Sequence, residues 1–240
     1  MDYRSMRDMN FNSSMGRLYY KFNEGSEGLA LILLHGFAAS SLSWSRLIRC
    51  IPDETCVVAV DLLGHGNSEA PEMEYTASNQ ATAIRELAES TGKKTIMFGH
   101  SYGAWLASLL AMDSVPEKLI IEDAAGLEAF DKERLSSNPE YLEDLVRQAL
   151  ITNPNERVVR SSVYSRREDD KLTCEKLTRI NVPTLIIWGA NDATVPARFA
   201  QTFNSCIKGS SLLVMDNVRH TPHYTNPNAV AEKVLGFIKQ

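Results

Sequence analysis

Ser101, His220 and Asp192 are residue types that together can make an alcohol nucleophilic, and each follows an expected strand. Ser101 lies between Gly99 and Gly103 in FGHSYGAW, directly after the apolar run TIMF. A serine hydroxyl is a weak nucleophile near neutral pH, so it needs a general base within hydrogen-bond reach. A carboxylate must then hold that base in one tautomer and stabilise its charged form. The three residues therefore predict acyl-transfer chemistry.

The glycines around Ser101 predict a sharp turn between a strand and a helix. Because Gly99 and Gly103 lack Cβ atoms, strand and helix can approach closely around a strained turn. A G-x-S-x-G turn of this kind lifts a nucleophile clear of a sheet. It also directs the N–H of Tyr102, at the helix N-terminus, toward negative charge that develops nearby. A glycine-flanked surface serine is the alternative interpretation.

The general base must be one of five histidines, and we predict His220. It follows the last expected strand, SLLVMD, at the carboxyl edge of the sheet, where open α/β sheets gather their ligands. His223 is the competing base, three residues later. The other three lie beside glycines at strand ends or turns, where we expect them to orient loops through backbone hydrogen bonds; they are His35, His65 and His100.

Asp192 is the predicted acid, because WGANDATVP places it just after the strand TLIIWG. Its other interpretation is an aspartate that caps the following helix. Asp123, which follows LIIE, is the alternative acid.

Two backbone N–H groups are predicted to hold the oxyanion of the reaction. The segment HGFAAS, residues 35–40, follows the first buried strand. Gly36 lets the backbone turn, so the N–H of Phe37 can face Ser101 beside that of Tyr102. Each such donor contributes about 3–4 kcal/mol to transition-state stabilisation in other enzymes. A simple tight turn is the alternative interpretation of this segment.

Short apolar runs alternate with helical patterns along most of the chain. This rhythm predicts a doubly wound, mostly parallel sheet with helices on both faces. Most of the runs lack polar alternation, as strands buried on both faces do. The expected strands are 29–36, 55–61, 94–100, 118–123, 183–189 and 211–216, with an antiparallel strand at 16–22. The expected helices are Ser41 to Ile51, Ala77 to Ser90, Tyr102 to Met112, Pro196 to Phe203 and Asn228 to Ile238.

The rhythm breaks once, between Asp123 and Val182, where no convincing strand occurs. We predict that residues 125–181 form a small helical cap on a core made of 1–124 and 182–240. Asn138 and Asn153 each precede a proline, which favours helix starts at these two positions.

The order Ser101, Asp192, His220, with HGF upstream, resembles the α/β-hydrolase superfamily. The likeness is greatest to its small serine esterases with a short helical lid. DLLGHGNSE, residues 61–69, is similar to the family's D-x-x-G-x-G-x-S loop. Arg219 departs from the pattern, because glycine often precedes the histidine in this family. The resemblance implies the α/β-hydrolase fold with a small helical cap.

The resemblance also implies a serine hydrolase that cleaves small carboxylic esters through an acyl-enzyme, with no metal or organic cofactor. Two alternatives stay open. The same triad serves carbon–carbon bond hydrolysis or cofactor biosynthesis in other members, and some proteins of this fold are ligand-binding receptors with weak turnover. Serine at the nucleophile position argues against epoxide hydrolases and dehalogenases of this fold.

Two groups of side chains bear on the substrate. Four arginines in the cap would suit an anionic substrate, namely Arg157, Arg160, Arg166 and Arg167. The acidic run that follows them favours a solvated mixed-charge face instead. Five aromatic residues are candidates for the pocket wall, although aromatics are more often core: Phe37, Trp44, Phe130, Tyr141 and Tyr164.

The chain has 240 residues and a net charge of −5, so it carries no basic footprint for nucleic acid. Its apolar runs are too short to cross a bilayer, and its first residues contain no apolar leader segment. We therefore expect a cytoplasmic protein with a small-molecule substrate; a homodimer is left open. The four scattered cysteines, Cys50, Cys56, Cys174 and Cys206, are expected to be reduced.

Overall fold

An eight-stranded sheet forms the centre of the protein, in the order β1-β2-β4-β3-β5-β6-β7-β8. The computed structural model describes residues 1–26, 28–165 and 167–240. Its strands are β1 (Arg7–Ser13), β2 (Gly16–Asn23), β3 (Leu29–Leu34), β4 (Cys56–Asp61), β5 (Lys94–His100), β6 (Lys118–Glu122), β7 (Thr184–Gly189) and β8 (Ser211–Met215). β2 pairs antiparallel with β1 and β4, and the remaining neighbours pair in parallel. The predicted mostly parallel sheet is confirmed. The prediction lacks β1, whose polar sequence RDMNFNS lies exposed or half-buried at the sheet edge.

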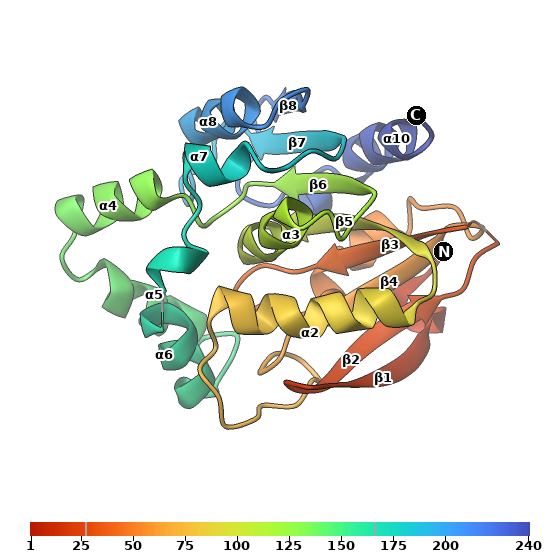
Figure 1. Cartoon of the computed structure of the whole chain (residues 1–240), viewed down its shortest axis with the longest axis horizontal. Helices are drawn as coiled ribbons and strands as arrows, with labels where there is room; N and C mark the ends of the chain where they lie inside the picture. Colours follow the sequence, from red (N-terminus) through yellow and green to blue (C-terminus); the bar gives the residue numbers. More distant parts are fainter. Residues whose placement is uncertain (27, 166) are drawn as a thin grey trace.

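Helices pack on both faces of this sheet (Figure 1). One face carries α2 (Ala77–Ser90), α3 (Tyr102–Met112) and α8 (Arg198–Cys206), and the other carries α1 (Ser45–Ile48) and α10 (Pro227–Ile238). Alternate residues of β3 serve the two cores, since Ile32 and Leu34 face the first set while Leu31 and Leu33 face the second. Burial on both faces explains why the strands are unbroken apolar runs.

The expected helix from Ser41 to Ile51 is wrong in its length and type. The structure has a 3-10 helix, η2 (Ser41–Trp44), followed by the single turn of α1. The serine-rich sequence SSLSWS has low helix propensity. Trp44 fixes the segment instead, because its fully buried ring packs beneath the sheet.

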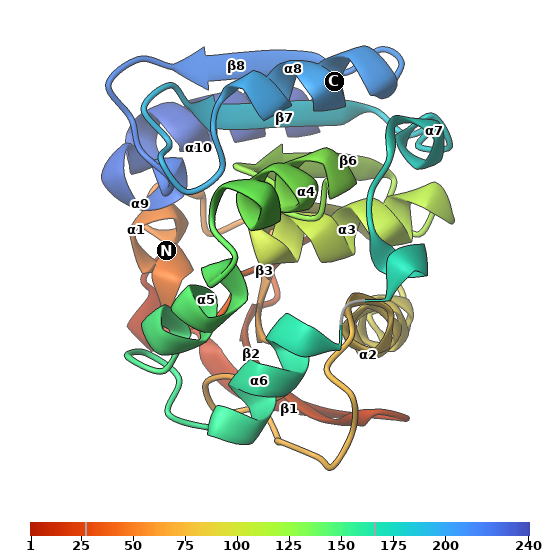
Figure 2. The ribbon, with the colours of Figure 1, turned by 90° about the vertical axis from the view of Figure 1, so that its left-hand side faces the viewer.

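Between β6 and β7 the described residues form helices and no strand of the sheet. They are α4 (Glu128–Ser137), α5 (Tyr141–Ala149), α6 (Glu156–Tyr164), η3 (Glu168–Asp170) and α7 (Cys174–Leu177). Figure 2 shows α4, α5 and α6 in front of the sheet. Residues of α5 and α6 share a small apolar cluster with Ala38. The division of the chain into core and cap at 125 and 181 stays a prediction.

The expected helix starts at Asn138 and Asn153 are wrong. Asn138 ends α4 and accepts a hydrogen bond from the Glu140 N–H, and α5 begins at Tyr141. Asn155, rather than Asn153, caps α6 by accepting from the Val158 N–H. Asparagine side chains that bond a backbone N–H two residues later make turns as readily as caps, so sequence alone does not separate the two.

The expectation of four reduced cysteines is also wrong. Cys174 and Cys206 form a disulfide, with their Cα atoms 5.2 Å apart. The bond joins α7 to α8, which lie side by side although the two cysteines are 32 residues apart in sequence. Cys50 and Cys56 are reduced. The pairing depends on the packing of two helices, which the cysteine spacing does not reveal.

None of the helices in the described ranges is long and apolar enough to cross a membrane. The cytoplasmic location stays a prediction. The cysteines no longer support it, because disulfides persist mainly in oxidising compartments.

The disulfide predicts that reduction destabilises the protein. A bond that closes a loop of this length contributes about 2–4 kcal/mol to the free energy of unfolding. Denaturant unfolding with and without dithiothreitol measures this difference. The double variant Cys174→Ser/Cys206→Ser is the control, and its stability should not respond to reductant. If alkylation under non-reducing conditions modifies both cysteines of the unfolded wild-type chain, the disulfide is wrong.

Candidate active site

Ser101 occupies the turn between β5 and α3 in a strained backbone conformation, with φ +50° and ψ −109°. A positive φ at a non-glycine residue costs about 1–3 kcal/mol and persists only where neighbours hold it. Here the Ser101 N–H donates to the Glu122 carbonyl at 2.9 Å. The Ser101 carbonyl accepts from the N–H groups of Trp105 and Ala125, each at 3.1 Å. These bonds fix the turn to β6 and to α3.

The two flanking glycines are required by close packing, as expected from the sequence. A Cβ atom on Gly99 would lie 2.3 Å from the Gly103 carbonyl oxygen. A Cβ atom on Gly103 would lie 2.1 Å from the Leu34 carbonyl oxygen. Any side chain at either position would push α3 away from the sheet and move Ser101.

The structure brings Ser101, His220 and Asp192 into one hydrogen-bonded series. His220 Nε2 lies 3.1 Å from Ser101 Oγ, and His220 Nδ1 lies 2.7 Å from Asp192 Oδ2. The side chain of Asp192 is fully buried. Its second oxygen, Oδ1, accepts hydrogen bonds from the N–H groups of Thr194 and Val195 at 2.7 and 3.0 Å. A carboxylate at Nδ1 selects the tautomer whose Nε2 lone pair faces the serine.

His223, the competing base, is directed elsewhere. Its Nδ1 pairs with the Glu122 carboxylate, and its backbone N–H donates to Glu122 Oε1 at 2.8 Å. The imidazole is buried against the Trp44 ring, with the ring centres 4.2 Å apart. His223 therefore ties α9 (Pro222–Thr225) to β6, and it does not line the cavity around Ser101.

The other three histidines orient loops through backbone hydrogen bonds, as the sequence predicts. His35 accepts from the Leu62 N–H at 3.0 Å, and His65 bonds the Leu63 carbonyl at 3.0 Å. Burial lowers the pKa of His35 to about 4 and that of His65 to about 3, so both are neutral at pH 7.

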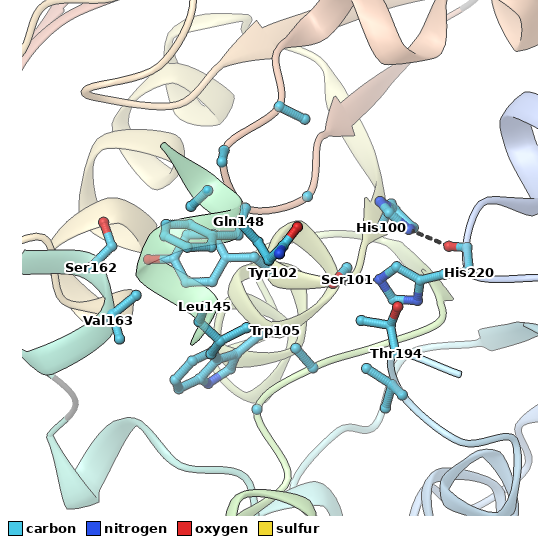
Figure 3. A pocket seen from close by; sticks show the side chains of 18 of the residues that line it. His100, Ser101, Tyr102, Trp105, Leu145, Gln148, Ser162, Val163, Thr194 and His220 are labelled. Carbon is cyan, nitrogen blue, oxygen red and sulfur yellow. Dashed lines mark hydrogen bonds between the residues drawn. The ribbon is translucent and has the colours of Figure 1, made fainter. Parts of the chain in front are cut away.

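His100 stands directly behind the predicted base. Its Nε2 donates to the His220 carbonyl at 2.7 Å, the bond drawn in Figure 3. Burial, and then the neighbouring His223 and His220, hold the pKa of His100 well below its ordinary value. The neutral imidazole thus positions the backbone of residue 220 without adding a charge.

Asp123, the alternative acid, lies close to the site without bonding the base. It follows β6 with φ +46°, is fully buried, and its Oδ1 accepts from the Gly189 N–H at 2.9 Å. Burial, followed by the charges of Glu122 and Asp192, raises the pKa of Asp123 to about 10. At neutral pH this carboxyl is protonated, so it cannot stabilise an imidazolium.

Two groups of side chains at this edge have metal-ligating atoms within 4.8 Å of one another: His100, Asp123 and His220, and His100, Glu122 and His223. Both groups share His100, whose Nε2 already donates to a carbonyl. In the first group His220 already pairs with Asp192, and in the second Glu122 already pairs with His223. These contacts favour an acid–base arrangement over an ion site, and the expectation of no cofactor stays a prediction.

The backbone of HGF passes directly against the serine. A Cβ atom on Gly36 would lie 3.5 Å from Ser101 Cβ. Phe37 and Tyr102 line the same cavity as Ser101, with their ring centres 6.1 Å apart. Tyr102 is the first residue of α3, where N–H groups have no acceptor within the helix. Both predicted oxyanion donors therefore belong to segments that flank the serine.

A cavity of about 440 Å³ opens beside Ser101 (Figure 3). Its volume lies within the usual range for small-molecule sites, roughly 300–1,000 Å³. Three of the five aromatic candidates line it, namely Phe37, Phe130 and Tyr141. Trp44 is instead part of the core, and Tyr164 is exposed on the surface.

The cap arginines within the described residues do not reach this cavity. Their partners are the Ala70 and Pro71 carbonyls for Arg157, Glu143 and Glu156 for Arg160, and Glu74 for Arg167. Arg166 lies outside the described residues. Arg219 is exposed and does not line the cavity. The described arginines belong to a mixed-charge surface, as the acidic run predicts.

The raised pKa of Asp123 predicts a pH-dependent gain in stability for Asp123→Asn. Between pH 6 and 9 the folded protein holds a proton that an unfolded aspartate, with a pKa near 3.9, has lost. The free energy of unfolding of the wild type therefore falls by up to about 1.4 kcal/mol per pH unit as the pH rises. Asp123→Asn cannot lose this proton, so its free energy of unfolding lacks this decrease. Urea unfolding across this pH range measures it, with the exposed Asp216→Asn as control. A wild-type–variant difference that does not change with pH would contradict the protonated state.

Comparisons with known proteins agree with this architecture. Residues 31–233 match the model of the alpha/beta hydrolase family. The uncharacterized hydrolase YugF of Bacillus subtilis is 24% identical over 92% of this chain and 94% of its own. Lipase 3 of Moraxella sp. is 24% identical over 91% of this chain and 81% of its own. The solved structure of an esterase from Exiguobacterium antarcticum has a TM-score of 0.80 and 19% identity, covering 98% and 100% of the two chains. The chain belongs to the α/β hydrolase family.

Proposed function

We propose that this protein is a serine hydrolase that cleaves carboxylic esters of small molecules through an acyl-enzyme. The observation that carries the proposal is the hydrogen-bonded series from Ser101 through His220 to Asp192 at the mouth of a largely apolar cavity. A sequence relative named as a lipase supports ester bonds as the target. Fold and family alone do not define a substrate, so the chemistry of the site carries the argument.

In the first half of the reaction, Ser101 Oγ attacks the ester carbonyl carbon. His220 Nε2 accepts the hydroxyl proton, and Asp192 stabilises the imidazolium that forms. The carbonyl oxygen becomes an oxyanion, to which the N–H groups of Phe37 and Tyr102 donate. His220 then returns the proton to the departing alkoxide, so that an alcohol leaves and the acyl group stays on Ser101.

In the second half, water replaces the alcohol. His220 removes a proton from the water as its oxygen attacks the acyl carbon. The tetrahedral intermediate uses the same two N–H donors and collapses as His220 protonates Ser101 Oγ. The products are the free carboxylic acid and the original serine, so every proton is accounted for without a further group.

Covalent labelling by a fluorophosphonate tests the proposed nucleophile. We expect one label per chain, on Ser101, and multiple turnovers of p-nitrophenyl butyrate. Ser101→Ala should lose both properties. Ser108→Ala, within the adjoining helix α3, is the control for a general loss of folding and should keep both. A single stoichiometric burst would indicate a binding protein on this scaffold, and unchanged turnover in Ser101→Ala would exclude this nucleophile.

Replacing each buried aspartate separately tests the assignment of the acid. Asp192→Asn should lower kcat on the order of 10⁴-fold, because an amide at this position disturbs the histidine tautomer. Asp123→Asn exchanges one neutral group for another, so kcat should change by no more than about threefold. Steady-state kinetics on one ester compares the two variants. The opposite ranking would assign the acid to Asp123.

A further inference from the structure

We propose that the acyl group of the substrate is neutral and bulky, either a medium-length aliphatic chain or an aryl-alkyl chain, and that acyl groups ending in a carboxylate are rejected. This inference rests on the proposed esterase function and names its substrate class. It follows from the direction in which the cavity extends, the side chains that form its wall, and the charges that the wall carries.

The direction follows from the position of the base. His220 must protonate the leaving alcohol, so the alcohol part of an ester lies on the His220 side of Ser101. The acyl part points to the opposite side. Figure 3 shows Tyr102, Trp105, Leu145 and, farthest away, Val163 on that side of the serine. We therefore assign this side of the cavity, called the acyl arm below, to the acyl group.

The wall of this arm is apolar and comes from several elements. Leu145 from α5 and Val163 from α6 contribute apolar side chains to it, and Phe130 from α4 lines the same cavity. Trp105 from α3 is held in place by donating from Nε1 to the Asp170 carbonyl at 2.6 Å. Gly126 leaves room for that ring, since a Cβ atom there would lie 2.5 Å from it. A chain of a few methylenes or a phenyl ring would bury its surface here, whereas an acetyl group would leave the arm unfilled.

The charge of the wall argues against an anionic acyl group. Among the described lining residues there is no lysine or arginine. The one acidic side chain is Asp131, which is buried at the start of α4. The remaining polar lining groups of the cap are neutral, such as Gln148 and Ser162. A carboxylate that entered would lose its water without gaining a cation, which is unfavourable.

Four p-nitrophenyl esters test the inference, because the alcohol stays constant while the acyl group changes. They are the acetate, the hexanoate, the phenylacetate and the monoester of hexanedioic acid. We expect kcat/KM for the hexanoate and phenylacetate to exceed that for the acetate by at least about tenfold. The hexanedioate monoester should fall at least about tenfold below the hexanoate. An acetate or a monoester that is hydrolysed as well as the hexanoate would overturn the inference.

Two pairs of variants connect this selectivity to the wall. Leu145→Trp narrows the arm and should lower the hexanoate-to-acetate ratio of kcat/KM at least about fivefold. Leu135→Trp, on an exposed surface of α4, should leave this ratio unchanged.

Gln148→Arg adds a cation at an exposed lining position and should raise the monoester-to-hexanoate ratio of kcat/KM, whereas Gln148→Met should not. A ratio that fails to respond to Leu145→Trp or to Gln148→Arg would contradict the assigned arm.

The two proposals fail in different ways. If none of the four esters gives turnover that is lost in Ser101→Ala, the proposed esterase function fails. If turnover depends on Ser101 but shows no preference, or prefers the acetate or the monoester, the function stands and the acyl assignment is wrong.

Discussion

The close passage of α3 across the ends of β3 and β5 is the constraint on which the site depends. Two glycines make it possible, because side chains at Gly99 or Gly103 would collide with backbone carbonyls. The passage forces Ser101 into a positive φ, and bonds to β6 and to α3 hold it there. The serine is thus positioned by backbone geometry, while its base and acid arrive on loops that follow β8 and β7.

Three carboxyl groups are buried at this one edge, and the structure gives each a different state or partner. Glu122 pairs with His223 and fastens α9 to the sheet. Asp192 pairs with His220, and two backbone N–H groups complete its hydrogen bonding. Asp123 accepts a hydrogen bond from the Gly189 N–H instead of an imidazole, and its raised pKa leaves it neutral. Because Asp123 is neutral and Glu122 pairs with His223, repulsion among like charges in this buried region is limited. Asp192 is then the carboxylate that acts on His220.

The parallel strands and the turn around Ser101 could be predicted from the sequence. The apolar runs identified the parallel strands, and the glycines around Ser101 identified the turn, because both signals lie within a few neighbouring residues. The disulfide could not be found in this way, since Cys174 and Cys206 meet only after α7 packs on α8. The helix α4 was missed because it buries only Phe130 and Asp131, too few residues to show a helical period. The protonated state of Asp123 depends on burial and on Asp192 as well as on the adjacent Glu122. The sequence contains the Glu-Asp pair, but it reveals neither the burial nor the approach of Asp192.

The account makes one covalent claim, that the acyl group passes through the oxygen of Ser101. Rapid-quench mass spectrometry during hydrolysis of a p-nitrophenyl ester measures this most directly. The account predicts a transient acyl group, at most one per chain, on the peptide that contains Ser101, with its decay matching the release of the acid. An acyl group on any other residue, or acid released with no acylated protein at any quench time, would contradict it.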